Sequence, residues 1–160
     1  MKKSNKLVVS LRVNGLAYEV LAEPHEKLLG VLREHIGLKG VKSGCEEGEC
    51  GACAILLDGE PVTSCMMLAG AAEGKEIITI EGLAKGGELH PLQEAFMKYH
   101  GMQCGYCTPG AIIAAKGLLD KNPNPTDQEV REGFSGNLCR CGSYPKMVKS
   151  VLEAAKVLSA

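Results

Sequence analysis

Eight cysteines in two groups constrain this chain of 160 residues more than any other feature of its sequence. The first group has C-x4-C-x2-C spacing followed by a fourth member, and consists of Cys45, Cys50, Cys53 and Cys65. The second group combines a C-x2-C pair with a distant C-x-C pair, and consists of Cys104, Cys107, Cys139 and Cys141. Four thiols are the number that a structural zinc ion or a small iron–sulfur cluster takes from a protein. Each half of the chain therefore carries a complete set of ligands for a metal centre.

The loop that holds the first three cysteines has the composition of a binding loop. Gly44, Gly48 and Gly51 allow positive φ and close approach of the backbone to an inorganic core, and their N–H groups can face the sulfurs. The spacing is that of plant-type [2Fe–2S] sites, whereas structural zinc sites favour C-x2-C knuckles. The first group therefore favours a [2Fe–2S] cluster over zinc.

The second group is less specific by its spacing alone. Its two cysteine pairs fit a cluster, a zinc site or a redox dithiol. Disulfides are disfavoured for both groups, because the basic start Met1–Lys6 is not followed by the long apolar segment of a secretory signal. These features predict a cytoplasmic protein whose cysteines bind metal.

Charge and hydropathy argue against several classes of partner. The formal net charge is -1, which provides no electrostatic basis for binding nucleic acid or an anionic membrane. No apolar run approaches the roughly 20 residues that a membrane span requires. The length fits one medium domain or two small ones.

The first half of the sequence, residues 1–81, predicts a small α+β domain. Alternating apolar residues and turn signals predict strands at Leu7–Val13, Leu16–Leu21, Ala54–Leu57 and Glu76–Ile80. Asn14 and Gly15 between the first two strands are a strong signal for a two-residue hairpin turn. A helical pattern of apolar residues follows at Lys27–His35, directly before the cysteine loop.

The second half of the sequence predicts helices. A glycine-rich linker is expected at residues 82–90, before a helical domain at residues 91–160. Helices are predicted at Pro91–His100, at Pro109–Asp120, after the capping box Thr126–Glu129, and from Pro145 onward. The second group of cysteines then falls in two loops between helices. This organisation predicts a four-helix bundle that clamps a second metal centre.

Three motifs, taken together, make the chain resemble a known family: Gly44–Cys53, Gln103–Gly110 and Gly136–Cys141. In this order they resemble the small iron–sulfur subunit of the molybdenum hydroxylases, the xanthine dehydrogenase family, which includes carbon monoxide and nicotinate dehydrogenases. The resemblance covers the chain from Leu7 to the last helix. It implies an N-terminal β-grasp, plant-type ferredoxin-like domain followed by the four-helix domain, with one [2Fe–2S] cluster in each.

The resemblance also implies the ligands, partners and activity. The first group of cysteines would bind the ferredoxin-type cluster, and the second group would bind the helical-domain cluster. Gln103 and Cys141 match residues that touch a molybdopterin held by a large partner subunit, and a medium subunit holds FAD. Electrons would pass from molybdenum through the helical-domain cluster and the ferredoxin-type cluster to FAD, during hydroxylation of a small molecule such as an N-heterocycle, purine or aldehyde. The implied assembly is a hetero-oligomer, for example a dimer of heterotrimers.

One motif departs from the common form of the family. Many members read Cys-Arg-Cys-Thr-Gly-Tyr, whereas Cys139–Tyr144 reads Cys-Arg-Cys-Gly-Ser-Tyr. The cysteines are unchanged, so the departure does not affect the cluster ligands. It affects the turn that would face the pterin, and it leaves the substrate subfamily undetermined. Tyr106, inside the C-x2-C pair, is interpreted as packing beside the cluster rather than as a redox-active tyrosine.

Two functions of other classes stay open. One is a free-standing ferredoxin-like electron carrier, against which the long helical domain argues. The other is a zinc-stabilised interaction module, against which the spacing of the first group argues.

Overall fold

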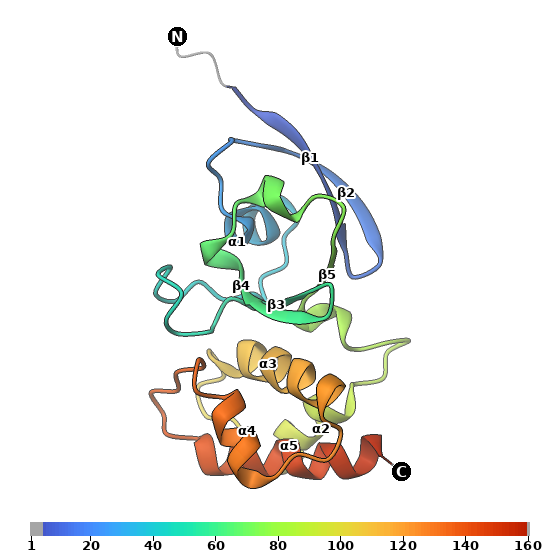
Figure 1. The fold of residues 1–160 in the computed structure, drawn as a ribbon, viewed down its shortest axis with the longest axis vertical. Helices are drawn as coiled ribbons and strands as arrows, with labels where there is room; N and C mark the ends of the chain where they lie inside the picture. The colour runs from blue at the N-terminus through green and yellow to red at the C-terminus, as the bar shows by residue number, and fades with distance from the viewer. Residues whose placement is uncertain (1–4, 160) are drawn as a thin grey trace.

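The computed structural model describes residues 5–159, and places a sheet and a set of helices in two adjoining halves (Figure 1). The basic start at residues 1–4 and Ala160 lie outside this description. The predicted α+β class is confirmed, with a mixed sheet in the first half and helices in the second. No helix within residues 5–159 is long and apolar enough to cross a membrane.

A five-stranded sheet builds the N-terminal half. Its strands are β1 (Leu7–Val13), β2 (Leu16–Ala22), β3 (Ala54–Leu57), β4 (Glu60–Thr63) and β5 (Glu76–Ile78). Their order is β2-β1-β5-β3-β4, with β1 parallel to β5 and the other neighbours antiparallel. Asn14 and Gly15 have φ angles of 53° and 79°, which form the predicted tight turn between β1 and β2.

One short helix packs against this sheet, as a β-grasp domain requires. It begins as α1 (Leu28–Gly30) and continues as a π-helical turn, η1 (Val31–His35), so the helix predicted at Lys27–His35 is confirmed. Its apolar side chains are buried in the core of the sheet half, among them Leu28, Leu29, Val31 and Leu32. The helix and the sheet together place the cysteine loop at the end of η1.

The strand β5 is shorter than the predicted strand Glu76–Ile80, because side chains interrupt the ladder. The Thr79 N–H donates to Asn14 Oδ1 at 2.9 Å, and Asn14 Nδ2 donates to Thr79 Oγ1 at 3.0 Å. The chain then turns into a 3₁₀ helix, η4 (Ile80–Gly82). Two further 3₁₀ helices lie between β4 and β5, namely η2 (Ser64–Met66) and η3 (Ala69–Ala72).

Four helices build the C-terminal half, as predicted, with small differences at their ends. They are α2 (Pro91–Lys98), α3 (Thr108–Lys121), α4 (Asp127–Gly133) and α5 (Tyr144–Leu158). Proline stands in the first turn of α2, α3 and α5. Backbone N–H groups in the first turn make no intrahelical hydrogen bond, so the lack of an N–H in proline costs the helix nothing there. The capping box of α4 is also confirmed. The Glu129 N–H donates to Thr126 Oγ1 at 3.3 Å, and the Thr126 N–H donates to Glu129 Oε2 at 2.7 Å.

The segment predicted as a linker is an ordered turn. Backbone hydrogen bonds of 3.0 Å join Lys85 and Glu88 in both directions, across Gly86 and Gly87 with positive φ. Leu83 is buried in the core of the helical half. The exact division of the chain into domains at residues 81–91 stays a prediction.

Strand β3 lies between two hydrophobic cores, and all four of its residues are buried. Ala54 and Leu56 belong to the core of the helical half, whereas Ile55 and Leu57 belong to the core of the sheet half. This division follows from the alternation of side chains along a strand. Helix α3 packs across β3, as Figure 1 shows, so the two halves form one continuous structure.

Candidate metal centres

Three cysteines of the first group lie on the loop between η1 and β3. Gly48 and Gly51 have φ angles of 85° and 67°, and the tight turns aim backbone N–H groups at sulfur. The N–H groups of Glu47 and Cys50 each donate to Cys45 Sγ at 3.4 Å. These bonds lower the pKa of Cys45 to about 7. The Cys45 N–H in turn donates to Cys50 Sγ at 3.4 Å, so these two cysteines form one pair of thiols.

Cys53 and Cys65 form the second pair of the first group, inside the core of the sheet half. Their side chains are buried, and their thiols lie against each other. Burial raises the pKa of Cys53 to about 11. Ser64 Oγ donates to Cys53 O at 2.8 Å and thereby fixes η2, which carries Cys65. Because burial disfavours the thiolate, this pair is suited to a cation that compensates its negative charge.

The second group of cysteines lies on two loops that meet at the beginnings of α3 and α5. Its thiols are paired across these loops, as Cys107 with Cys139 and Cys104 with Cys141. Burial raises the pKa of Cys107 to about 12. The Tyr106 N–H, with the Cys141 thiol, lowers the pKa of Cys104. At Cys139 burial opposes ionisation, but nearby donors outweigh it and lower the pKa.

Both groups are thus arranged as two pairs of thiols. All eight cysteines are free, so no disulfide competes with metal binding. Within the described part of the chain, no three His, Cys, Asp or Glu side chains converge on a position for a single metal ion. A [2Fe–2S] core takes two protein ligands at each of its two irons. The donor set of each group therefore fits such a core.

The two cysteine loops are in direct contact with each other. The Leu138 N–H, next to Cys139 in the chain, donates to Cys50 O at 3.0 Å. Asn137 Nδ2 donates to Gly51 O at 3.3 Å in a buried position. Cys50 of the first group and Cys139 of the second group are therefore linked through one hydrogen bond and the backbone of Leu138.

Glycines permit this close approach of the two loops. A Cβ atom on Gly51 would lie 2.3 Å from Gly136 O, and a Cβ atom on Gly110 would lie 2.3 Å from Gly51 O. Both contacts are with backbone, which cannot rotate away as a side chain can. The interface between the loops therefore requires glycine at Gly51 and Gly110.

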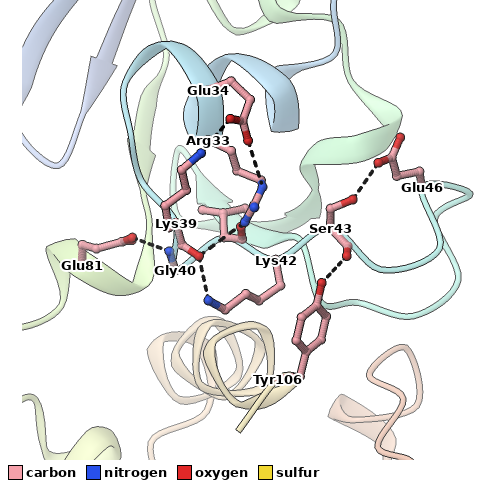
Figure 2. A network of polar contacts seen from close by, with 10 residues as sticks. Arg33, Glu34, Lys39, Gly40, Lys42, Ser43, Glu46, Glu81 and Tyr106 are labelled. Atoms are coloured by element: carbon pink, nitrogen blue, oxygen red, sulfur yellow. Dashed lines mark hydrogen bonds and ion pairs between the residues drawn. The ribbon is translucent and has the colours of Figure 1, made fainter.

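A second contact joins the two loops through Tyr106. Half of this side chain is exposed, and its hydroxyl donates a hydrogen bond to Ser43 O, as Figure 2 shows. Ser43 Oγ donates to Glu46 Oε1 at 2.6 Å. Tyr106 is thus a tie between the halves, a role that sequence analysis missed. The two partners are 63 positions apart, and no local pattern signals such a contact.

The start of the first cysteine loop is held in place by further polar contacts. Arg33 Nη1 donates to Val41 O at 2.6 Å, and the Gly40 N–H donates to Glu81 Oε1 at 2.7 Å. In Figure 2 these contacts reach the segment from η1 on one side and from η4 on the other. The loop that carries Cys45 is therefore anchored from several elements.

The two residues predicted to touch a pterin lie together. Gln103 Nε2 donates to Cys141 O at 2.9 Å. Gln103 is exposed and Cys141 is half-buried, so both belong to the surface beside the second group of cysteines. Their contact with a pterin stays a prediction.

Comparison with known families matches each half of the chain to a separate model. Residues 11–83 match the family described as "2Fe-2S iron-sulfur cluster binding domain". Residues 79–152 match the family described as "[2Fe-2S] binding domain". Each match includes one of the two groups of four cysteines.

Similar proteins extend the match over the whole chain. The nicotinate dehydrogenase small FeS subunit of Eubacterium barkeri is 51% identical over 152 residues, which cover 95% of this chain and 97% of that protein. The aldehyde oxidoreductase of Megalodesulfovibrio gigas is 44% identical over 152 residues, which cover 93% of this chain but 17% of that protein. The structure of quinoline 2-oxidoreductase from Pseudomonas putida 86 has a TM-score of 0.94 at 43% identity and covers 98% of both chains. The likeness therefore includes both halves and their relative arrangement.

Proposed function

Because the chain belongs to the small [2Fe–2S] iron–sulfur subunits of the molybdenum hydroxylases, the xanthine dehydrogenase family, we propose that it relays electrons through two clusters within a multi-subunit oxidoreductase. We further propose that the catalytic site lies in a partner subunit rather than in this chain. The observation that carries the proposal is the pairing of all eight thiols in two groups whose loops touch at Leu138 and Cys50.

This pairing supports an assignment of the cluster ligands. We assign the ferredoxin-type cluster to Cys45, Cys50, Cys53 and Cys65, and the helical-domain cluster to Cys104, Cys107, Cys139 and Cys141. When bound, each cluster supplies a one-electron carrier whose potential depends on its ligands, its burial and hydrogen bonds to its sulfurs. The protein holds the two centres at a fixed separation, through the Leu138–Cys50 hydrogen bond on one side and the Tyr106–Ser43 hydrogen bond on the other.

The family and the exposed position of Gln103 support a proposal for the partners. We propose that a large subunit presents its molybdopterin at Gln103 and Cys141, and that a medium subunit presents FAD near the ferredoxin-type cluster. The match to a short part of aldehyde oxidoreductase supports a larger partner, because there the same unit is part of a longer chain. The complex would be a cytoplasmic hetero-oligomer, for example a dimer of heterotrimers, and would oxidise an N-heterocycle, purine, aldehyde or similar small molecule.

Metal analysis and spectroscopy of the native complex test this function. We expect about four irons and four sulfides per chain, two distinct EPR signals after reduction, and molybdenum and flavin in the co-purifying subunits. A complex without molybdenum and flavin would contradict the proposed partners. Zinc in place of iron would support an interaction module, and a monomer in native mass measurements would support a free-standing carrier.

A further inference from the structure

Two buried hydroxyl groups lack a hydrogen-bond partner, and both lie beside the second group of cysteines. Among the side chains of residues 5–159, the buried N and O atoms without a partner are Thr108 Oγ1 and Ser143 Oγ. Thr108 directly follows Cys107, and Ser143 follows Cys141 after one residue. Ser143 is only 1% exposed, so water does not reach its hydroxyl. Both unpartnered groups therefore lie where we assign a cluster.

Helix capping does not account for Ser143, although this residue stands at the N-cap of α5. Its backbone has φ −75° and ψ 4°, outside the extended region typical of a capping serine, and its side chain makes no capping bond. Its own carbonyl accepts the N–H groups of Lys146 and Met147 at 3.0 and 2.9 Å. Thr126, by contrast, caps α4 with its side chain. The Ser143 hydroxyl is therefore free for another acceptor.

The Ser143 side chain lies on the side of the loop that carries the sulfur of Cys139. A turn closed by the Gly142 N–H, which donates to Cys139 O at 3.4 Å, folds the chain back so that the Ser143 backbone N–H and side chain face the Cys139 sulfur. The Ser143 hydroxyl is thus directed toward the Cys139 sulfur, but it makes no hydrogen bond to any described protein atom. An unsatisfied buried hydroxyl is destabilising, and a thiolate that binds iron would accept its proton in a hydrogen bond.

We propose that the Ser143 hydroxyl donates a hydrogen bond to the Cys139 thiolate when the helical-domain cluster is bound, and that this bond raises the reduction potential of that cluster. The proposal rests on the proposed function, because it requires a cluster at the second group of cysteines. Reduction adds negative charge to the cluster and its sulfurs, so a donor stabilises the reduced form more than the oxidised form. Ser143 is thus a positioning residue that acts through Cys139.

Redox titration of the intact complex with the S143A substitution, followed by EPR, tests the proposal. We expect the ratio of oxidised to reduced helical-domain cluster at a fixed potential to rise by about tenfold, which corresponds to a midpoint lower by about 59 mV for a one-electron couple. The potential of the ferredoxin-type cluster should stay unchanged, because Ser143 lies in the other half. S143T, which keeps the hydroxyl, should retain the wild-type potential.

A matched control is S150A, on the same helix. Ser150 is also buried, but its Oγ donates to Lys146 O at 2.8 Å, so its removal should leave both potentials unchanged. S143G provides a second variant without the hydroxyl, since glycine is tolerated at an N-cap.

The outcomes separate this inference from the proposed function. A helical-domain EPR signal with an unchanged potential in S143A and S143G would overturn the role of Ser143 alone. Loss of the cluster in both variants, but not in S143T, would show that the hydroxyl is needed for assembly and would overturn its role in tuning. Absence of the second signal from the wild-type complex would instead contradict the proposed function.

Discussion

The two halves of the molecule build their metal centres in different ways. In the sheet half, three of the four cysteines lie on one short loop, and local backbone N–H groups already face Cys45. In the helical half, the proposed ligands come from two distant loops that meet at the beginnings of α3 and α5, two helices that contribute to one hydrophobic core. The first centre is therefore largely encoded in local sequence, whereas the second depends on the tertiary packing of the helices.

Removing one ligand from each centre should have the largest effect and tests the independence of the two. We expect Cys45→Ser to abolish the ferredoxin-type EPR signal and to leave about half of the iron, with the helical-domain signal intact. Cys139→Ser should give the opposite pattern. Loss of both signals in either variant would show that the two centres assemble together. It would contradict the view that the first centre depends on local sequence and the second on the packing of the helices.

Truncating the strand that both cores share should destabilise one half more than the other. Leu56→Ala removes a buried side chain from the helical core, and Ile55→Ala removes one from the sheet core. Each should cost about 2–5 kcal/mol of unfolding free energy. Denaturation followed by visible circular dichroism of the clusters should show earlier loss of the helical-domain signal in Leu56→Ala. Equal loss of both signals in both variants would mean that the halves unfold as one unit.

Two helical glycines, one in each half, should respond to alanine with opposite signs. Gly110→Ala places a Cβ atom against Gly51 O, and overpacking of this kind costs about 1–3 kcal/mol. At Gly30 the nearest atom to a new Cβ is Glu26 Oε1 at 3.7 Å, so alanine fits there. Gly30→Ala should then stabilise the protein by about 0.5–1 kcal/mol through helix propensity. Thermal unfolding measures both changes, and stabilisation by Gly110→Ala would refute the close contact between the loops.

The smallest expected effect concerns the tie between the halves. Tyr106→Phe removes the hydrogen bond to Ser43 O and should reduce the free energy of unfolding by about 0.5–1 kcal/mol, because the hydroxyl is partly exposed to water. Tyr18→Phe is a control, since the Tyr18 hydroxyl makes no hydrogen bond to any other residue that the structure describes. Chemical denaturation measures the difference, and equal stability of the two variants would exclude a structural role for this tie.

Sequence reasoning succeeded where short-range rules determine the structure. The Asn14–Gly15 turn, the capping box at Thr126 and the prolines in the first turns of helices were all confirmed, because each depends on residues that are close in the sequence. The first group of cysteines could be interpreted as a [2Fe–2S] site for the same reason, because three of its members lie within nine residues of the sequence. The second group had no unique interpretation without the family resemblance, because a long chain segment separates its two pairs.

Contacts between distant loops could not be predicted from the sequence. Tyr106 was expected to pack beside a cluster, and its hydrogen bond to Ser43 has no local signature. The contact from Leu138 to Cys50 involves only backbone atoms, which every residue except proline can provide. The end of β5 was also misjudged, because the side chain of Asn14, distant in sequence, interrupts the ladder.

The burial of β3 from both sides has a consequence for biosynthesis. Translation completes β3 and all four cysteines of the first group by residue 65, before α3 is synthesised from residue 108 onward. During that interval Ala54 and Leu56 lack the helix that covers them in the finished protein. A nascent chain therefore exposes an apolar strip beside the first group of cysteines, and this strip is open to aggregation until the helices have been synthesised and have folded over it.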